Sequence, residues 1–125
     1  MNNLVKVYKV LADESRLRVL NLLLERECCV CEVMQVLDIS QSKASRILTA
    51  LHDAGIAVVN RDGLWALYSL DFQNMTPELK AIISATAQSF TGNRLMSSDR
   101  ERLRQAVRVG PGCCTKTGSE SKSAA

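Results

Sequence analysis

The sequence of 125 residues predicts a mainly α-helical fold with one small β-hairpin, and three observations support this prediction. Before position 55, apolar residues recur at intervals of three and four, which is the period of an amphipathic helix. Between positions 56 and 70, β-branched and aromatic residues flank the turn-forming triplet Arg61-Asp62-Gly63. Helical spacing returns after Thr76-Pro77. The length suits one small domain with a modest core.

The helices expected before the hairpin cover residues 3–12, 14–25, 31–38 and 41–54. Asp13 and Ser40 are placed to cap the second and fourth of them, because a short side-chain oxygen can accept a bond from the first helical N–H groups. The fourth helix carries an apolar stripe at i, i+3, i+4 and i+7 that begins at Ala44. Gly55 follows it, at the position where a helix end favours a left-handed residue.

After this point the sequence predicts strands at 57–60 and 65–70, a helix at 77–91 and a C-terminal amphipathic helix within the segment 93–109. Thr76 is the expected cap of the first of these helices, and Pro77 suits its first turn. Residues 98–101, with the sequence SDRE, have the form of a capping box and predict that the last helix begins there. After Gly110 the sequence is small and polar, and we expect residues 110–125 to form a flexible tail that contains cysteines.

Composition limits the class of protein. The formal net charge of +3 is too small to indicate nucleic-acid binding by itself. The N-terminus lacks the pattern of a signal peptide, and no apolar stretch approaches the roughly 18 residues of a membrane span. We therefore expect a soluble, cytoplasmic protein without a membrane partner. The five cysteines, with adjacent pairs at 28–29 and 113–114, suit a reducing compartment and thiolate chemistry better than a disulfide scaffold.

Two short helices joined by a tight turn and followed by a hairpin form the pattern of a winged helix-turn-helix. With its apolar stripe buried, helix 41–54 would present hydrogen-bonding groups and two cations outward, with no carboxylate before Asp53. Such a face suits the major groove, where Arg pairs with guanine, Gln with adenine, and Ser, Thr or Lys reach phosphates. Arg61, expected at the hairpin tip, is placed for the minor groove or the backbone. The alternative is an ordinary solvated helix face. The candidate DNA-binding residues are Gln41, Ser42, Lys43, Ser45, Arg46, Thr49 and Arg61.

The stretch from Val10 to Leu70 resembles the arsenical-resistance repressors, the ArsR/SmtB type of metal-sensing regulators. The motifs that carry the resemblance are "LADESRLRVL", "CVCE", "ISQSKASRILTALHDAGI" and "RDGLWALYSL". The family implies the winged helix-turn-helix order α-α-α-α-β-β-α(-α) and a homodimer formed through the N-terminal helix and helix 77–91. It also implies a repressor that binds double-stranded operator DNA and leaves it when an inducer binds. Residues 1–92 would then form the DNA-binding and dimerisation domain.

The stretch "ECCVCEV" contains Cys28, Cys29 and Cys31 at the head of the third helix. The resemblance assigns Cys29 and Cys31 to a family Cys-Val-Cys motif, whereas the position of that family's third cysteine is Met34 here. In a regular helix, residues two apart point about 200° away from each other, so Cys29 and Cys31 can meet only if the first turn is not regular. Cys28 and Cys31 are three apart and would share a face. A helix N-terminus is expected to lower the thiol pKa.

Trivalent arsenic or antimony is the inducer that this cluster suggests, because soft ions prefer thiolates. The expected ligands are Cys28, Cys29 and Cys31. Cys113 or Cys114, from the same or the partner subunit, is an alternative source of a third sulfur, and a small thiol is another. Binding is expected to distort the turn before the recognition helix and so to lower the affinity for DNA. No organic cofactor is expected.

Several other classes of protein have to be weighed. A thiol-redox repressor, or a sensor of Cd(II), Pb(II) or Zn(II), would use the same fold, and the cysteines could also be buried core residues. The resemblance disfavours zinc, because it implies a zinc site of His and carboxylates on the C-terminal dimer helix, whereas the one histidine, His52, lies on the expected DNA face and residues 77–91 offer one acid. An enzyme is disfavoured because no cysteine is followed by Arg six positions later and no Gly-rich phosphate loop is present. A thiol metal buffer, from yet another class, would not need the recognition face.

Overall fold

The computed structural model describes residues 2–108, which form helices and one antiparallel hairpin. In chain order the elements are α1 (Asn2–Leu11), α2 (Glu14–Glu25), α3 (Val30–Leu37), α4 (Gln41–Asp53), β1 (Ala57–Asp62), β2 (Trp65–Leu70), a short 3-10 turn (Phe72–Asn74), α5 (Pro77–Ser89) and α6 (Arg94–Gln105). The expected fold class, mainly α with a β-hairpin wing, is confirmed. No helix within residues 2–108 has the length and apolar character needed to cross a membrane. The expected tail, 110–125, lies outside the described residues.

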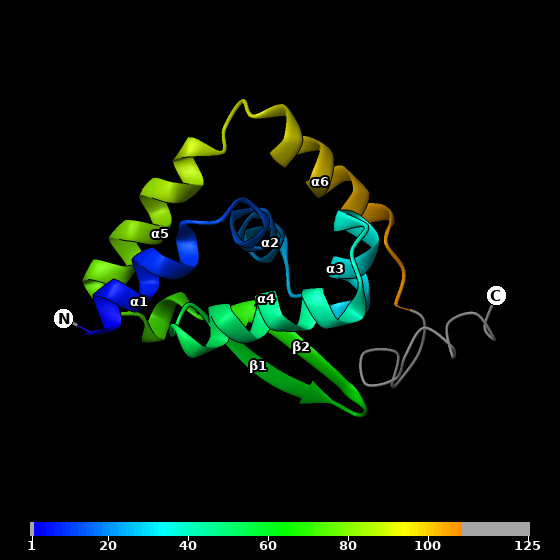
Figure 1. Ribbon diagram of the computed structural model, residues 1–125, viewed down its shortest axis with the longest axis horizontal. Coiled ribbons are helices and arrows are strands. Elements are labelled where there is room, and N and C mark those ends of the chain that lie inside the picture. The colour runs from blue at the N-terminus through cyan, green and yellow to red at the C-terminus, as the bar shows by residue number, and fades with distance from the viewer. Residues whose placement is uncertain (1, 109–125) are drawn as a thin grey trace.

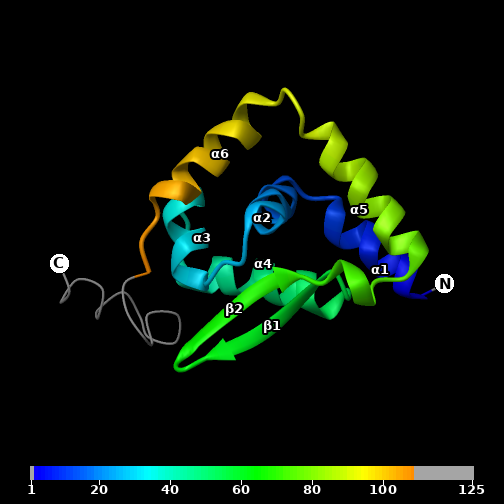
Figure 2. The same cartoon turned by 180° about the vertical axis from the view of Figure 1, so that it is seen from behind.

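Helix α2 lies at the centre of the fold, and the other elements surround it (Figure 1). We call the hairpin of β1 and β2 the wing. Helix α4 and the wing lie along one side of the molecule, and the view from behind shows the same arrangement (Figure 2). Helix α6 packs against both α2 and α3. Helices α1 and α5 line one cavity together with the end of α4.

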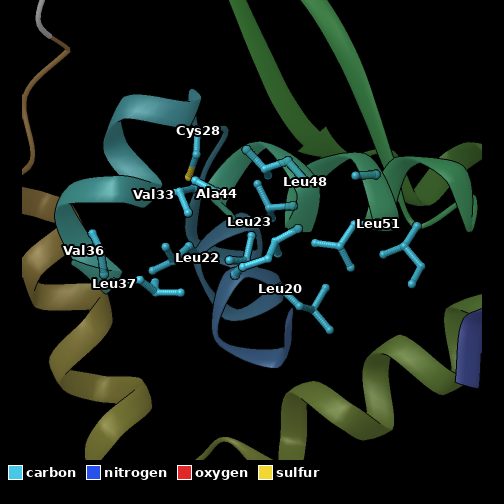
Figure 3. Packing of buried hydrophobic residues seen from close by; sticks show 14 of the residues in the cluster. Leu20, Leu22, Leu23, Cys28, Val33, Val36, Leu37, Ala44, Leu48 and Leu51 are labelled. Carbon is cyan, nitrogen blue, oxygen red and sulfur yellow. The ribbon is translucent and has the colours of Figure 1, made fainter. Parts of the chain in front are cut away.

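The core is formed by the apolar stripes of α2, α3 and α4. Leu20 and Leu22 of α2 and Leu48 and Leu51 of α4 are fully buried within it (Figure 3). Burial of one leucine side chain contributes about 2 kcal/mol, so this layer supplies much of the driving force for folding. Because the stripe of α4 is buried as predicted, the residues between its members face outward.

The predicted caps hold the helix-turn-helix in place. The Asp13 carboxylate accepts the backbone N–H of Arg16 at 3.0 Å, and the Ser40 hydroxyl accepts that of Lys43 at 3.1 Å. Helix α3 ends at Asp38, whose φ of 57° places it in the left-handed region that Asp tolerates better than most residues. This reversal lets α4 begin three residues later.

The predicted start of the last helix is wrong. Helix α6 begins at Arg94, and the side chain of Asn93 caps it by accepting the backbone N–H of Met96 at 3.0 Å. Asp99 lies inside the helix and is fully buried, where its carboxylate accepts two bonds from Arg18, at 2.7 and 2.9 Å. Ser98 and Glu101, the two end positions of the predicted capping box, also lie inside the helix, and the Glu101 carboxylate pairs with Arg104 at 3.0 Å. The helix ends at residue 105, before the predicted end at 109.

The wing has a two-residue turn that differs from the prediction. Strand β1 extends to Asp62, and the turn consists of Gly63, with φ of 63°, and Leu64. Arg61, expected at the hairpin tip, instead lies within β1 and is paired with Ala66. The first position of this two-residue turn needs a positive φ, which glycine adopts without strain, and this explains why Gly63 occupies it.

Candidate functional site

Helix α4 presents most of the predicted DNA-binding residues at the surface. Its buried residues are Ala44, Ile47, Leu48 and Leu51. The side chains of Ser42, Lys43, Arg46 and Thr49 are exposed, and those of Gln41 and Ser45 are half-buried. Within residues 2–108, the side chains of Lys43, Arg46 and Arg61 form no hydrogen bond or ion pair, so their charges are available to a partner. Asp53, at the end of the helix, is exposed and lies 3.4 Å from the His52 ring.

A shallow groove runs along this face, and one of its residues comes from a different helix. It is lined by Arg16, Ser42, Ser45, Arg46, Thr49, Ala50 and Asp53. Arg16 belongs to the first turn of α2 and was not predicted as a site residue. The sequence contained only a weak signal for it, because an arginine in an amphipathic helix is usually a solvated surface residue.

The turn that contains the cysteines, residues 28–31, is not a regular helical turn. Cys28 precedes α3 and exchanges two backbone hydrogen bonds with Tyr68 of β2, at 2.9 and 2.8 Å. Cys29 is the N-cap residue, with extended backbone angles of −99° and 169°. Cys31 is the second residue of the helix, after Val30. The helical rule that separates residues two apart therefore does not apply to Cys29 and Cys31.

The cysteines divide between two groups of buried residues. Cys28 belongs to the main core (Figure 3). Cys29 and Cys31 form a separate buried group with Leu67 of β2, against which Trp65 packs; we call this the thiol cluster. The expectation that Cys28 and Cys31 share one face is wrong for this structure, because Cys28 lies outside the helix. The two cysteines of the Cys-Val-Cys motif are the ones that share a cluster.

The expected activation of the thiols by the helix N-terminus fails at Cys28. Burial, together with the negative charge of Glu32, raises the pKa of Cys28 to about 12 from its ordinary value of 9.0. The positive charges of Arg26 and Arg108 oppose this shift without cancelling it. The thiol donates to the backbone carbonyl of Arg26, with a sulfur–oxygen distance of 3.4 Å. In this conformation Cys28 is a protonated core residue.

A buried carboxylate beside the cluster ties several segments together. Glu32 is 2% exposed and accepts the backbone N–H of Cys29 at 2.9 Å. It also accepts Arg26 at 2.9 Å and Arg108 at 3.2 Å. The Arg108 guanidinium lies 5.4 Å from the centre of the Trp65 ring. The chain that follows α6 is thus held against the wing and the thiol cluster, which the sequence did not predict.

A complete three-ligand site is not assembled in this conformation. Within residues 2–108, no group of three His, Cys, Asp or Glu side chains is placed to hold a metal ion. Met34, at the position of the family's third cysteine, packs against the main core and not the thiol cluster. Cys113 and Cys114 lie outside the described residues. The ligand set expected from the sequence remains a prediction.

Comparison with known proteins identifies relatives among bacterial regulators. The model of the arsR family of bacterial regulatory proteins matches residues 13–58. The arsenic resistance transcriptional regulator ArsR1 of Pseudomonas putida is 46% identical over 65 residues, 51% of each chain. ArsR2 of the same organism is 35% identical over 114 residues, which cover 86% of this chain and 95% of the relative. A cadmium resistance regulatory protein, a CadC homolog of Staphylococcus aureus, is 36% identical over 74 residues, 58% of this chain and 61% of that protein.

The matched lengths differ between these relatives. The chain spans about half the length of ArsR1, whereas it spans nearly all of ArsR2. These relatives are transcriptional regulators and not enzymes, which agrees with the prediction. Among solved structures, HlyU from Vibrio cholerae superposes with a TM-score of 0.61 and 29% identity, covering 72% of this chain and 94% of HlyU. The sequence match across ArsR2 and the shared fold establish that the chain belongs to the arsR family of bacterial regulatory proteins.

Proposed function

We propose that the protein is a metalloid-responsive transcriptional repressor. A dimer binds operator DNA through α4 and the wing, and it leaves the DNA when trivalent arsenic or antimony binds cysteine thiolates. The observation that carries this proposal is the position of the cysteine turn, which opens α3 of the helix-turn-helix and is hydrogen-bonded to β2 of the wing. A protein of this kind works in the cytoplasm, where operator DNA is found.

The DNA-binding surface is proposed from α4. Ser42, Lys43, Arg46 and Thr49 are exposed on one face, and the apolar side of the helix is buried in the core. Gln41, Ser45 and the strand residue Arg61 complete the set of proposed contacts. Base edges would be read by Gln41 and Arg46, and the phosphates would be contacted by the hydroxyl groups and the other cations. This face has the donors that a major-groove helix requires.

Dimerisation is proposed through α1 and α5. Leu4, Val5 and Tyr8 of α1 are 37%, 44% and 56% exposed, which is high for apolar side chains on an amphipathic helix. Helix α5 lines a cavity with α1 and contributes Leu79 and Ile82. A second copy of the chain would bury these surfaces. Residues 1–92 then supply the DNA-binding and dimer surfaces, and α6 docks on α2 and α3.

The proposed inducer site is built on the thiol cluster. Cys29 and Cys31 supply two sulfurs that already lie in one buried group. Each thiol replaces one hydroxide of arsenous acid: an As–S bond forms, an As–O bond breaks, and the thiol proton leaves with the hydroxide as water. Trivalent arsenic and antimony both suit thiolate ligands, so the site does not distinguish them by softness.

The third sulfur has two sources in the chain. Cys28 would have to leave the main core and give up its two backbone hydrogen bonds with Tyr68. Cys113 or Cys114 would come from the tail, which continues from Arg108 beside Glu32. Cys113 follows Arg108 by five residues, and a chain of that length reaches up to about 17 Å when extended. Chain length therefore permits the tail to supply a ligand, while adjacency in sequence favours Cys28.

Release from DNA follows from the attachment of the cysteine turn to the wing and to α3. A ligand that favours a rearranged turn over the present one shifts the population away from the DNA-competent conformation. If Cys28 joins the ligand set, its bonds to Tyr68 break and β2 loses that support. If the tail supplies the sulfur, Trp65 and Leu67 must adjust to an ion placed within their cluster. Both routes act on the wing.

The test is operator binding by fluorescence anisotropy, with a duplex from the promoter region of the protein's own gene. Arsenite and antimonite should lower the affinity of the wild type, and Cys29→Ser and Cys31→Ser should be insensitive to both. The double variant Cys113→Ser/Cys114→Ser separates the tail from Cys28 as the source of the third sulfur. Equal DNA affinity with and without arsenite would overturn the sensing role, and absence of DNA binding would favour a thiol metal buffer.

A second candidate function uses the same fold with a different signal. One relative is named as a cadmium resistance regulator, and a thiol-redox sensor would also use buried cysteines. Titrating the same duplex complex with Cd(II), Pb(II), Zn(II) and peroxide distinguishes these signals from arsenite. Release by peroxide alone, reversed by a reductant, would favour the redox sensor.

A further inference from the structure

We propose that Arg16 of α2 contacts the DNA phosphate backbone beside the recognition helix. This inference rests on the proposed DNA-binding function and adds a residue outside α4 and the wing. Its basis is the groove in which Arg16 lies with residues of α4. The partner of Arg16 would be a phosphodiester group, and this contact would hold α4 in register on the DNA without reading a base.

The first argument comes from a comparison of two arginines on one helix. Arg16 and Arg18 are two positions apart, so their side chains point about 200° away from each other. Arg18 faces α6, where its guanidinium donates two bonds to the buried carboxylate of Asp99. The Arg16 side chain forms no hydrogen bond or ion pair within residues 2–108, and only its backbone N–H is used, by the Asp13 cap. Arg18 therefore has a structural role, and the Arg16 charge is available.

The second argument is the chemistry of the groove. Arg16 and Arg46 bring two guanidinium groups from two helices to one surface, which Ser42, Ser45 and Thr49 also line. Guanidinium and hydroxyl groups are the usual donors to phosphate oxygens. The groove is open, and its donors suit an extended polyanion.

Asp53 limits where a phosphate can lie in the groove. It lines the same groove and is the one carboxylate among its residues. A phosphate would be repelled by Asp53 and attracted by the two arginines. The DNA backbone is thereby expected to lie closer to Arg16 and Arg46 than to Asp53.

The experiment measures DNA affinity as a function of salt for Arg16→Gln. Each phosphate contact contributes about 0.9 to the slope of log K against log salt, so loss of Arg16 should lower the slope by about 0.9 per protomer and weaken binding roughly eightfold per protomer at about 0.1 M salt. The loss of DNA affinity should be equal on the operator and on a shuffled duplex of the same length. Arg16→Lys should restore most of it, because a phosphate contact needs charge more than a fork of donors.

The matched control is Arg94→Gln, which removes the same charge from an exposed position in the first turn of α6. It should leave the slope close to that of the wild type, and thermal melting should show that both variants are folded. If Arg16→Gln matches this control, or if its loss is confined to the operator sequence, the phosphate contact is overturned. If the wild type binds neither duplex, the proposed function itself fails and this contact fails with it.

Discussion

The backbones of Cys28 and Tyr68 exchange two hydrogen bonds, from the N–H of Cys28 to the carbonyl of Tyr68 at 2.9 Å and in the reverse direction at 2.8 Å. This pair adds one residue of the cysteine turn to the edge of β2. Cys29, which follows Cys28, lies in the thiol cluster with Leu67, which precedes Tyr68. The wing and the candidate inducer site are therefore parts of one packed unit, and a change in either reaches the other.

Trp65 should report inducer binding directly. It is the one tryptophan of the chain, it packs against the thiol cluster, and Arg108 lies over its ring. Adding arsenite to the protein without DNA should change the tryptophan emission, because the ring environment depends on the position of the cysteines. Cys29→Ser and Cys31→Ser should abolish the change. Release from the operator with unchanged emission would contradict the link between thiol cluster and wing.

Cys28 should make stability fall with pH above about 9 in the protein without metalloid. Its pKa is raised by burial to about 12, whereas the unfolded thiol ionises near 9.0. Between these values the unfolded state binds fewer protons than the folded state, so the free energy of unfolding decreases as pH rises. The expected loss is about 1 kcal/mol between pH 7 and pH 10.

The control for this prediction is Cys28→Ala, which keeps every other titrating group. Urea unfolding of both proteins at several pH values gives the comparison. The stability advantage of the wild type over Cys28→Ala at pH 7 should shrink by that amount at pH 10. A pH-independent difference would show that the Cys28 thiol ionises at the same pH in both states.

Much of the fold was predictable because it depends on local signals. The apolar stripe that begins at Ala44, the caps at Asp13 and Ser40 and the glycine of the hairpin are each encoded within a few residues, and the structure confirms them. The error at the start of α6 has the opposite origin. Residues 98–101 have the form of a capping box, but Asp99 among them pairs with Arg18, which is 81 residues away, and no local pattern reveals such a contact.

The site was harder to predict than the fold for the same reason. Spacing in a regular helix suggested Cys28 and Cys31 as neighbours, but the extended backbone of Cys29 changes which side each sulfur faces. Glu32 and Arg108 are 76 residues apart, so their contact beside the thiol cluster depends on how α6 docks. The family resemblance did indicate the Cys-Val-Cys pair, which the structure places in one cluster.

Loss of the Asp99 carboxylate should destabilise the fold strongly. The side chain is 1% exposed, and among residues 2–108 it pairs with Arg18 alone, which is 19% exposed. Asp99→Ala leaves that guanidinium partly buried without its partner, and we expect the free energy of unfolding to fall by about 3 kcal/mol. Glu101→Gln is the matched control, because it alters an exposed ion pair of the same helix with Arg104, and it should cost far less than Asp99→Ala. Similar costs in urea unfolding for the two variants would refute this role.

Replacing Glu32 by Gln should detach the end of the described chain from the wing. The amide can still accept the backbone N–H of Cys29, but it loses the charge that holds Arg26 and Arg108. Both arginines are partly exposed, at 35% and 23%, so we expect a modest stability loss of about 1–2 kcal/mol. The Trp65 emission of the protein without metalloid should shift to that of Arg108→Gln, because the guanidinium no longer stays over the ring.

Glu25→Gln is the matched control for this change. Glu25 also pairs with two arginines, Arg100 at 3.5 Å and Arg104 at 3.3 Å, but these contacts join α2 to α6 and do not involve Trp65. It should lower stability by a similar or smaller amount and leave the emission spectrum unchanged. The Gln35 side chain donates to the backbone carbonyl of Val107 and accepts the backbone N–H of Val107. If Glu32→Gln leaves the emission spectrum as unaltered as Glu25→Gln does, then these two hydrogen bonds, and not the Glu32 carboxylate, hold Arg108 at Trp65.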